Sequence, residues 1–138
     1  DENSWAGTEF ERMGDAAKVM AVLTFTLPNG QPLIYTGQEM GWNKRFEFFE
    51  KDNIPAWETN EYTEFYKELT ALRHNNAALA AGERGGKIEY IEDVPAGVFA
   101  FTRAVEGNSV TVYANLTKEP ILFNDINLTA WGWNIITK

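Results

Sequence analysis

The sequence contains no cysteine and only one histidine, His74. Without cysteine there is no disulfide, no thiolate nucleophile and no cysteine metal site. No apolar run approaches the roughly 20 residues that a membrane-spanning helix requires, and the first residues of the given sequence do not have the pattern expected of a signal peptide. The chain begins at Asp1 rather than at an initiator methionine, which suggests a cut or processed N-terminus.

Basic residues are also scarce. Lys and Arg together number 12 against 20 Asp and Glu, so the formal net charge is −8. A protein that follows a nucleic-acid backbone needs a basic patch to displace counterions, and an anionic membrane surface attracts basic segments. The composition therefore argues against nucleic-acid and membrane-surface partners.

The remaining composition is that of a globular domain. The chain has 138 residues, 44% of them hydrophobic and 23% charged, which is enough for a substantial core. Aromatic residues are abundant at 14%. This enrichment makes the aromatic side chains the first candidates for packing or for ligand contacts.

The first part of the chain reads as a helix, a strand and a second helix. Residues 1–14 show no clear period and are expected to form a loop, after which Asp15 can cap a helix over residues 16–26. The strand 32–36 contains Leu, Ile and Tyr in succession without apolar and polar alternation. A strand of this kind is buried on both faces, which is typical of a parallel sheet.

The second helix and the strands that follow have clearer periods. Thr59 or Asn60 can cap a helix whose apolar face recurs every three or four residues, ending between residues 73 and 79. From residue 87 the period changes to two, and residues 98–105 and 110–117 read as a hairpin. Further strands are expected at residues 87–92, 120–123 and 133–137. The fold class is therefore α+β, an α/β unit followed by an antiparallel sheet.

The single parallel strand that is predicted needs neighbouring strands with which to pair. A parallel strand that is buried on both faces needs neighbouring strands, and this chain has only one between its two helices. Most of the sheet that buries residues 33–35 is therefore expected to lie outside this sequence. Loops at the carboxyl ends of such strands usually carry the chemistry.

Four segments resemble the alpha-amylase family of glycoside hydrolases, in order and over nearly the whole chain. "GDAAKVMAVLTFTLPNGQPLIYTGQEMG" resembles the end of the family's catalytic barrel, with Asn29 as one extra residue in the usual Pro-Gly turn. "FFEKDNIPAW" resembles the loop after the last strand, and "ELTALRHNNAALAAG" the last barrel helix and its exit. The remainder, down to "AWGWNIIT", resembles the family's C-terminal β-domain.

This resemblance implies a division of the chain. Residues 1–81 would be the last βα units of a (β/α)8 barrel, with one parallel strand and two helices. Residues 82–138 would be an antiparallel β-domain of sandwich or Greek-key type. The expected partners are the rest of the catalytic barrel and an α-glucan or oligosaccharide substrate. An exposed barrel strand would also allow the isolated chain to associate with itself.

The resemblance also implies a role for Asp1. In the family the penultimate barrel strand ends in Asn-His-Asp, whose Asp stabilises the transition state, and Asp1 occupies the corresponding position. The nucleophile and the acid/base would lie on earlier strands, so a retaining glycosidase of starch-like or malto-oligosaccharide substrates is implied for the parent protein. The isolated chain is expected to be inactive. No cofactor is expected in it, although calcium is possible elsewhere in the parent.

Four further residues are candidates for substrate contact. Glu39 follows the strand directly, although the resemblance favours a structural role for it at the barrel mouth. Trp42 and Arg45 lie on the next loop, where an aromatic face suits a sugar ring and Arg can donate to hydroxyls. Trp5 could line the same cleft. The loop aromatics Phe46, Phe48 and Phe49 are expected to fold the loop onto its own helix.

Other motifs have simpler interpretations. His74 follows a helix end, where capping or exposure is expected, and Trp131 and Trp133 are expected to pack a final strand rather than to bind sugar. The glycosylation sequons at Asn115 and Asn127 are short enough to occur by chance. A non-catalytic β-domain for carbohydrate binding or interaction remains the alternative function. A soluble bacterial protein is expected, with a secreted or periplasmic location slightly favoured over the cytoplasm.

Overall fold

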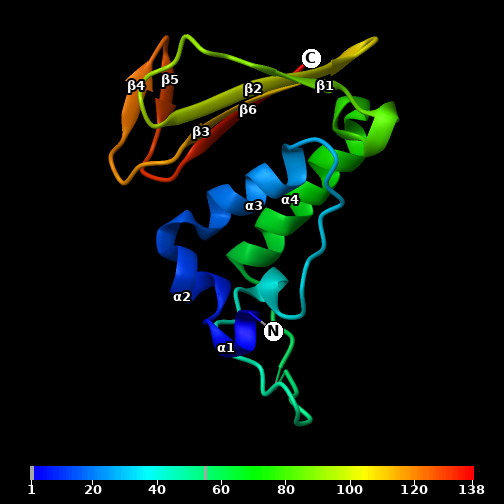
Figure 1. Ribbon diagram of the computed structural model, residues 1–138, viewed down its shortest axis with the longest axis vertical. Coiled ribbons are helices and arrows are strands. Elements are labelled where there is room, and N and C mark those ends of the chain that lie inside the picture. Colours follow the sequence, from blue (N-terminus) through cyan, green and yellow to red (C-terminus); the bar gives the residue numbers. More distant parts are fainter. Residues whose placement is uncertain (1, 55) are drawn as a thin grey trace.

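The computed structural model describes residues 2–54 and 56–138. The molecule is elongated, with the strands gathered at one end and the N-terminal helices at the other (Figure 1). The α-helices are α1 (Glu2–Trp5), α2 (Glu9–Met13), α3 (Ala17–Thr26) and α4 (Glu61–Asn75), and 3₁₀ turns cover Gly14–Ala16, Gln38–Met40, Ala77–Leu79 and Gly82–Arg84.

The predicted N-terminal loop is wrong, because α1 and α2 occupy most of it. Helix α2 begins with a capping box, in which Thr8 accepts from the backbone N–H of Glu11 and Glu11 accepts from that of Thr8. These reciprocal bonds satisfy two donors that a helix start leaves free. The cap predicted for the next helix is also wrong, since Asp15 lies in a 3₁₀ turn and Ala16 precedes α3 without a side-chain cap bond.

The strand predicted over residues 32–36 is not formed within the described residues. The segment runs between α3 and the turn Gln38–Met40 without a ladder partner. Leu33 is 80% exposed and Tyr35 is 51% exposed. A strand exists only as part of a ladder, and no described segment of this chain pairs with residues 31–35. The predicted burial of this segment on both faces is therefore not observed.

The prediction of the second helix is confirmed. Helix α4 begins after Asn60, whose side chain accepts hydrogen bonds from the backbone N–H groups of Tyr62 and Thr63. Its buried residues Phe65 and Leu69 are four positions apart and share one face. The helix ends at Asn75, within the predicted range.

The predicted antiparallel sheet is also confirmed. Four strands pair in the order β1-β2-β3-β6, and β4 and β5 form a separate two-stranded ribbon. A Greek key would place the last strand beside the first, whereas here β6 lies beside β3 at the opposite edge from β1. Two-residue connections such as the turn at residues 106–107 favour sequential pairing. The strands are β1 (Lys87–Tyr90), β2 (Val98–Val105), β3 (Asn108–Asn115), β4 (Ile121–Phe123), β5 (Ile126–Leu128) and β6 (Trp133–Thr137).

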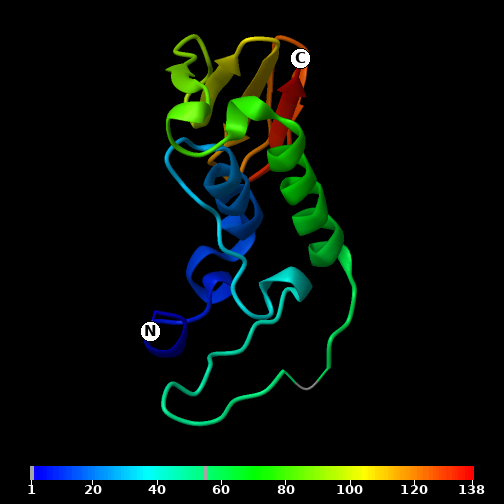
Figure 2. The same cartoon turned by 90° about the vertical axis from the view of Figure 1, so that its right-hand side faces the viewer.

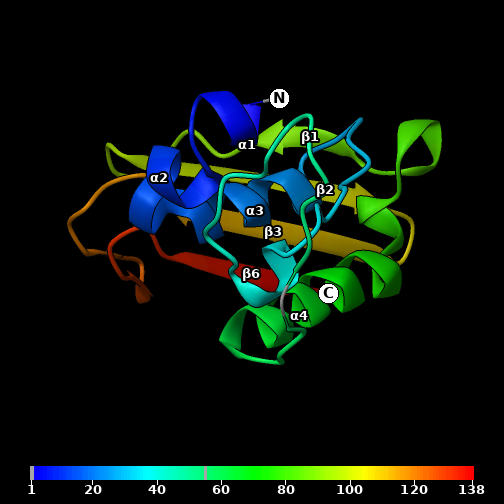
Figure 3. The ribbon, with the colours of Figure 1, turned by 90° about the horizontal axis from the view of Figure 1, so that it is seen from below.

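One face of the four-stranded sheet rests on α3 and α4. Figure 2 shows the strands above the two helices, and Figure 3, seen from below, shows the helices in front of the sheet. A single cluster of buried side chains joins the helices to β2 and β3. The predicted division at residue 81 into two domains therefore crosses a shared core, and it stays a prediction. The cluster includes Val19, Val22, Leu23, Phe25, Phe65, Leu69, Leu79, Phe101, Val110 and Val112.

Two arginines donate hydrogen bonds to the backbone carbonyls at the carboxyl end of α3. Arg103, on β2, is 1% exposed. Its guanidinium donates to the carbonyls of Thr26 at 3.0 Å, Ala80 at 2.9 Å and Gly86 at 2.9 Å. Arg73, on α4, donates to the carbonyl of Phe25 at 2.7 Å. The last carbonyls of a helix have no partner within it, so these two cations satisfy them and also complement the negative end of the helix dipole.

We expect Arg103→Met to destabilise the fold. Methionine fills similar space, but the buried carbonyls that accept hydrogen bonds from Arg103 would lose their donor. A buried polar group without a partner costs about 1–3 kcal/mol, so the free energy of unfolding should fall by about 3 kcal/mol, measured from urea denaturation. The matched control is Arg84→Met at an exposed arginine, which should change stability by less than about 0.5 kcal/mol. Equal midpoints for the two variants would contradict this role.

Candidate functional site

The turn Gln38–Met40 is held against the start of α4. Left-handed glycines flank it, and a Cβ on Gly41 (φ 65°) would lie 2.4 Å from the ring of Tyr62. Only glycine therefore allows the turn to approach the helix this closely. Thr63 donates its hydroxyl to the carbonyl of Glu39 at 2.8 Å, and Asn60 donates to the carbonyl of Met40 at 2.7 Å.

The segment 2–12 is tied to the segment 37–46 by polar contacts. Gln38 donates its side-chain amide to the carboxylate of Glu9 and accepts from the backbone N–H of Tyr35 at 2.6 Å. The Thr8 hydroxyl donates to Asn43. These bonds join residues 29 and 35 positions apart, so they fix one loop relative to the other.

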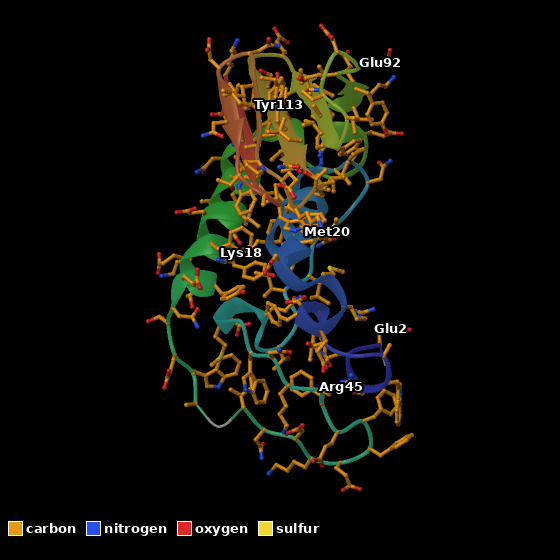
Figure 4. All side chains as sticks on the ribbon, turned by 90° about the vertical axis from the view of Figure 1, so that its left-hand side faces the viewer. Glu2, Lys18, Met20, Arg45, Glu92 and Tyr113 are labelled. Atoms are coloured by element: carbon orange, nitrogen blue, oxygen red, sulfur yellow. The ribbon has the colours of Figure 1, made fainter. Side chains whose placement is uncertain are left out.

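Two more contacts extend this connection toward the end of the molecule. Arg45 donates its Nε–H to the carboxylate of Glu11 at 2.8 Å. The side chain of Asn3 accepts from the backbone N–H of Phe46 at 3.2 Å. Figure 4 shows Arg45 at the end of the molecule that also carries Glu2, far from Tyr113 on the sheet.

A pocket of about 180 Å³ opens where the two segments meet. Its wall combines carboxylate, amide and hydroxyl groups with the ring of Trp42. Such a mixture can hold a polar ligand by hydrogen bonds while one ring supports its apolar face. The pocket is lined by Asn3, Thr8, Glu9, Phe10, Arg12, Tyr35, Thr36, Gln38 and Trp42.

The carboxylates around the pocket differ in their electrostatics. Burial raises the pKa of Glu9, against the opposing effects of the Gln38 amide and Arg12. The hydrogen bond from Arg45, followed by that from the backbone of Thr8, lowers the pKa of Glu11. The pKa values of the two carboxylates therefore shift in opposite directions, upward for Glu9 and downward for Glu11.

The structure brings some of the predicted site residues together. Trp42 lines the pocket, and Arg45 lies beside it on the same loop. Trp5 is 62% exposed and lies outside the pocket wall, against Phe48 at a ring-centroid distance of 5.5 Å. The side chain of Glu39 faces a different depression, beside α4, with Thr63 and His74. Asp1, the predicted catalytic carboxylate, lies outside the described residues.

The loop aromatics pack differently from the prediction. Phe46 contacts Trp42 at 5.3 Å and Tyr35 at 5.7 Å between ring centroids. Phe48 and Phe49 contact Trp5 on α1. The rings therefore join the loop to the N-terminal segment rather than to α4.

The simpler interpretations of the remaining motifs agree with the structure. His74 is exposed and its Nδ1 lies 3.0 Å from the carbonyl of Thr70. Trp133 packs against Phe65 with ring centroids 5.5 Å apart. Asn115 is fully buried and its side-chain amide donates to two backbone carbonyls, so its sequon is inaccessible.

Sequence reasoning missed Glu9, Glu11 and Gln38. The signal for Glu11 was present, because Thr8 followed three residues later by Glu is the pattern of a capping box. Glu9 and Gln38 gave no local signal, since each is placed by a partner on the other segment. Within residues 2–54 and 56–138, no group of three or more His, Cys, Asp or Glu side chains could hold a metal ion.

No helix among the described residues is both long enough and apolar enough to cross a membrane. The polar contacts and the pocket are formed by residues of α1, α2 and the segment 35–46, and Figure 1 shows α1 and α2 at the end of the molecule opposite the sheet. The site is therefore a loop-built cleft on a helical support.

Two curated proteins are clearly similar in sequence. Alpha-amylase MalA of Haloarcula japonica is 36% identical over 110 residues, which are 77% of this chain and 16% of that protein. Neopullulanase 2 of Thermoactinomyces vulgaris is 35% identical over 107 residues, which are 74% of this chain and 18% of that protein. The chain thus spans less than a fifth of the length of these relatives. No protein-family model matches the chain.

Solved structures share the fold. The cyclic alpha-maltosyl-(1→6)-maltose hydrolase of Arthrobacter globiformis matches with a TM-score of 0.67 and 20% identity, over 94% of this chain and 31% of that one. The maltogenic amylase of S. marinus matches with a TM-score of 0.69 and 20% identity, over 87% of this chain and 19% of that one. The chain belongs to the alpha-amylase family of glycoside hydrolases and matches the C-terminal region of its relatives.

We expect Glu11 to connect the two segments through its charge. Its folded pKa lies below the ordinary 4.5, so the contact with Arg45 contributes above that pH and is lost as pH falls through the lowered value. Glu11→Gln keeps an acceptor for Thr8 but loses the charge. Amide exchange at residues 43–46 should therefore be about two- to fivefold faster at pH 6, and the difference should shrink as the pH falls below 4.5.

The matched control for this measurement is Glu47→Gln, at an exposed glutamate on the same loop. This variant should leave exchange at residues 43–46 unchanged at both pH values. Equal acceleration by the two substitutions would mean that general loop charge, rather than the Glu11–Arg45 pair, sets the local stability.

Proposed function

We propose that this chain is the C-terminal part of a glycoside hydrolase that cleaves α-glucosidic bonds of starch-like or malto-oligosaccharide substrates with retention. Residues 1–81 supply the end of its catalytic barrel and residues 82–138 its C-terminal β-domain. The relatives named amylase and neopullulanase support this proposal, as does the small share of their length that the chain spans.

The observation that carries the proposal is the extended segment 31–35. Leu33 and Tyr35 are largely exposed, and no described segment pairs with this backbone. An apolar segment without a ladder partner is costly in water, because its apolar side chains stay exposed and its edge is free to pair with another strand. It is explained if the segment is a barrel strand whose neighbours belong to the rest of the protein.

The position of the pocket agrees with this assignment. The turn Gln38–Met40 and the loop with Trp42 follow directly after the proposed strand. Active-site loops of barrel enzymes stand at the carboxyl ends of the strands. The pocket at the junction of residues 2–12 and 37–46 would then be part of the substrate cleft.

The chemistry follows the two-carboxylate scheme of retaining glycosidases. One carboxylate attacks the anomeric carbon while a carboxylic acid protonates the leaving oxygen, with the two about 5–5.5 Å apart. We assign both groups to the rest of the protein. The isolated chain would then be inactive, and turnover of starch by a preparation free of the full-length protein would contradict this assignment.

The residues of this chain would contact and stabilise the sugar, whereas the groups that break the glycosidic bond would lie in the rest of the protein. Asp1 would stabilise the positive charge that develops at the ring in the transition state. Trp42 would support a sugar face, and Arg45 would donate to hydroxyls from the amino groups that its bond to Glu11 leaves unused. Trp5 and Glu39 are the remaining candidates for substrate contact, with Glu39 favoured as a structural residue of the barrel mouth.

The alternative of a free-standing carbohydrate-binding β-domain has less support. Trp133, a candidate for such a surface, packs against Phe65 on α4. The sheet also shares its core with α3 and α4, so the β-strands alone would expose a large apolar face.

We expect the 138-residue chain, produced alone, to associate through residues 33–35. An unpaired apolar segment pairs with another copy, and a charge placed on it opposes this. Sedimentation should therefore show concentration-dependent association that Leu33→Lys abolishes. The matched control is Leu122→Lys on β4, where the side chain is 74% exposed. A strictly monomeric parent chain, or equal effects of both substitutions, would contradict the assignment of residues 31–35 as a barrel strand.

We expect Asp1→Asn in the full-length protein to lower kcat on soluble starch by at least about 10²–10³. Loss of one preorganised electrostatic partner of the transition state typically has this effect, and only interactions stronger in the transition state accelerate the reaction. The melting temperature should barely change, because a cleft carboxylate is not part of the core.

The control for this experiment is Asp15→Asn, at an exposed aspartate in the 3₁₀ turn before α3. It should leave both turnover and melting temperature unchanged. Near-normal turnover of Asp1→Asn would remove Asp1 from the catalytic residues, and lost turnover with a collapsed fold would make its role structural.

A further inference from the structure

The side chain of Gln38 joins two segments that are distant in the sequence. Its amide nitrogen donates to the carboxylate of Glu9 on α2, and its oxygen accepts from the backbone N–H of Tyr35 at 2.6 Å. An ionised carboxylate only accepts hydrogen bonds and a backbone N–H only donates them, so the two partners fix the orientation of the amide. We call the bond between the two side chains the Glu9–Gln38 contact.

Both ends of this contact are held in place by further bonds. Gln38 lies in a turn flanked by left-handed glycines, and the hydroxyl of Thr63 on α4 donates to the carbonyl of the next residue in that turn. Glu9 begins α2, where the capping box of Thr8 and Glu11 fixes the first turn of the helix. The contact therefore sets the position of α2 relative to the end of the segment 31–35.

The position of α2 in turn determines that of α1. Only residues 6–8 separate the two helices, and Gly7 turns the chain there with a φ of 109°. A Cβ on Gly7 would lie 3.0 Å from the carboxylate of Glu11, so this link is closely packed. Asp1 directly precedes α1 in the sequence. A displacement of α2 would therefore also move the backbone that carries Asp1.

The other contacts between these segments offer less protection or no titratable group. The side chains of Arg45 and Glu11 are 50% and 41% exposed, and exposed ion pairs are screened by water and salt. The Glu9–Gln38 contact and the bond between Thr8 and Asn43 are partly buried, so water competes less for their groups. Of these two, only the Glu9–Gln38 contact includes a carboxylate, which makes it sensitive to pH.

The surroundings of Glu9 give little compensation for a second negative charge. Burial raises the pKa of Glu9, with Arg12 among the opposing effects, but Arg12 is also paired with Glu2 at 3.3 Å. Among the residues that line the two depressions beside Glu9, the other titratable side chains are the phenols of Tyr35 and Tyr66. Burial raises the pKa of Tyr66, so this phenol stays uncharged. A second carboxylate facing Glu9 would therefore be repelled.

We propose that Glu9 and Gln38 are positioning residues, whose contact holds the segment that carries Asp1 in a fixed place relative to the end of the last barrel strand. This inference rests on the proposed function, because it takes Asp1 as the group that stabilises the transition state. The two residues act through Asp1 and not by touching the reacting bond. Misplacement of a reacting group by about 1 Å can lower a rate by about 10²-fold.

The first variant is Gln38→Glu in the full-length protein. At about pH 8 two ionised carboxylates repel each other at the contact, so kcat on soluble starch should fall by about ten- to hundredfold. At about pH 5 one carboxyl group holds a proton and donates it to the other, so kcat relative to the unaltered protein at the same pH should recover to within about threefold. KM should change little, because the lost interaction acts in the transition state.

Exchange of the two side chains restores the contact. In the double variant Glu9→Gln with Gln38→Glu, the amide at position 9 donates to the carboxylate at position 38, which still accepts from Tyr35. This variant should recover kcat to within about threefold of the unaltered protein at both pH values. Glu9→Gln alone keeps an acceptor for the Gln38 amide, so it should lower kcat by no more than about threefold.

The matched control is Asn124→Asp, which makes the same change from amide to carboxylate. Asn124 is exposed in the turn between β4 and β5, and Asp tolerates its left-handed backbone (φ 46°) as Asn does. This variant should leave kcat unchanged at both pH values. The melting temperature of each variant is measured at the same two pH values, so that kcat is compared well below unfolding.

Three results would overturn the inference. The first is a normal kcat of Gln38→Glu at the higher pH, and the second is a double variant that does not recover. The third is a loss in Glu9→Gln as large as that in Gln38→Glu, which would give the Glu9 carboxylate a direct part in the reaction. A lowered melting temperature with unchanged kcat would make the contact purely structural, as the first result requires.

The outcome for the proposed function is separate. If the unaltered full-length protein does not hydrolyse starch, the proposed function fails. Amide exchange at Ala6, whose N–H donates to the carbonyl of Glu2 at 2.9 Å, then tests the contact by itself. Exchange there should be faster in Gln38→Glu at the higher pH and should return to normal in the double variant. Equal exchange in all three proteins would show that the contact does not hold α1.

Discussion

The fold depends on the hydrogen bonds that two arginines donate to the backbone carbonyls at the carboxyl end of α3. This helix packs beside α4 against the sheet, and Phe25 and Thr26 at its end are buried, so their carbonyls need hydrogen-bond donors from the protein. Arg103 reaches them from the sheet and Arg73 reaches them from α4. A planar guanidinium with several donors can bind carbonyls from different segments at once. The side chain of Arg103 therefore holds α3, β2 and the connecting segment 80–86 together.

This arrangement separates two kinds of stabilisation along the molecule. Near the sheet, apolar side chains from α3, α4 and the central strands exclude water and make the dry core. At the opposite end, polar contacts such as Glu9–Gln38 and Glu11–Arg45 hold loops over little buried apolar surface. Hydrogen bonds and exposed ion pairs contribute less than core burial, so this end is the part that can adjust its geometry to a ligand.

The sequence predicted the elements whose stability is local. Helix α4 was predictable because its cap and its apolar face follow from neighbouring residues, and the β2–β3 hairpin because its strands alternate on both sides of a short turn. The strand at residues 32–36 was not formed because its pattern requires partners outside the described segments. The loop contacts were not predictable, since Gln38 and Glu9 are joined only by the tertiary fold.

The same distinction explains why the resemblance found the family but not the details of the site. Motifs such as the glycine turn at residues 37–41 are fixed by backbone geometry, because a Cβ on Gly41 would meet Tyr62, and geometry of this kind is readable in the sequence. The placement of Trp5 against Phe48 depends on two loops whose relative position is set by four polar contacts. Ligand recognition at this end is therefore a property of the assembled loops, and small changes at Glu9, Glu11 or Gln38 could alter it without altering the core.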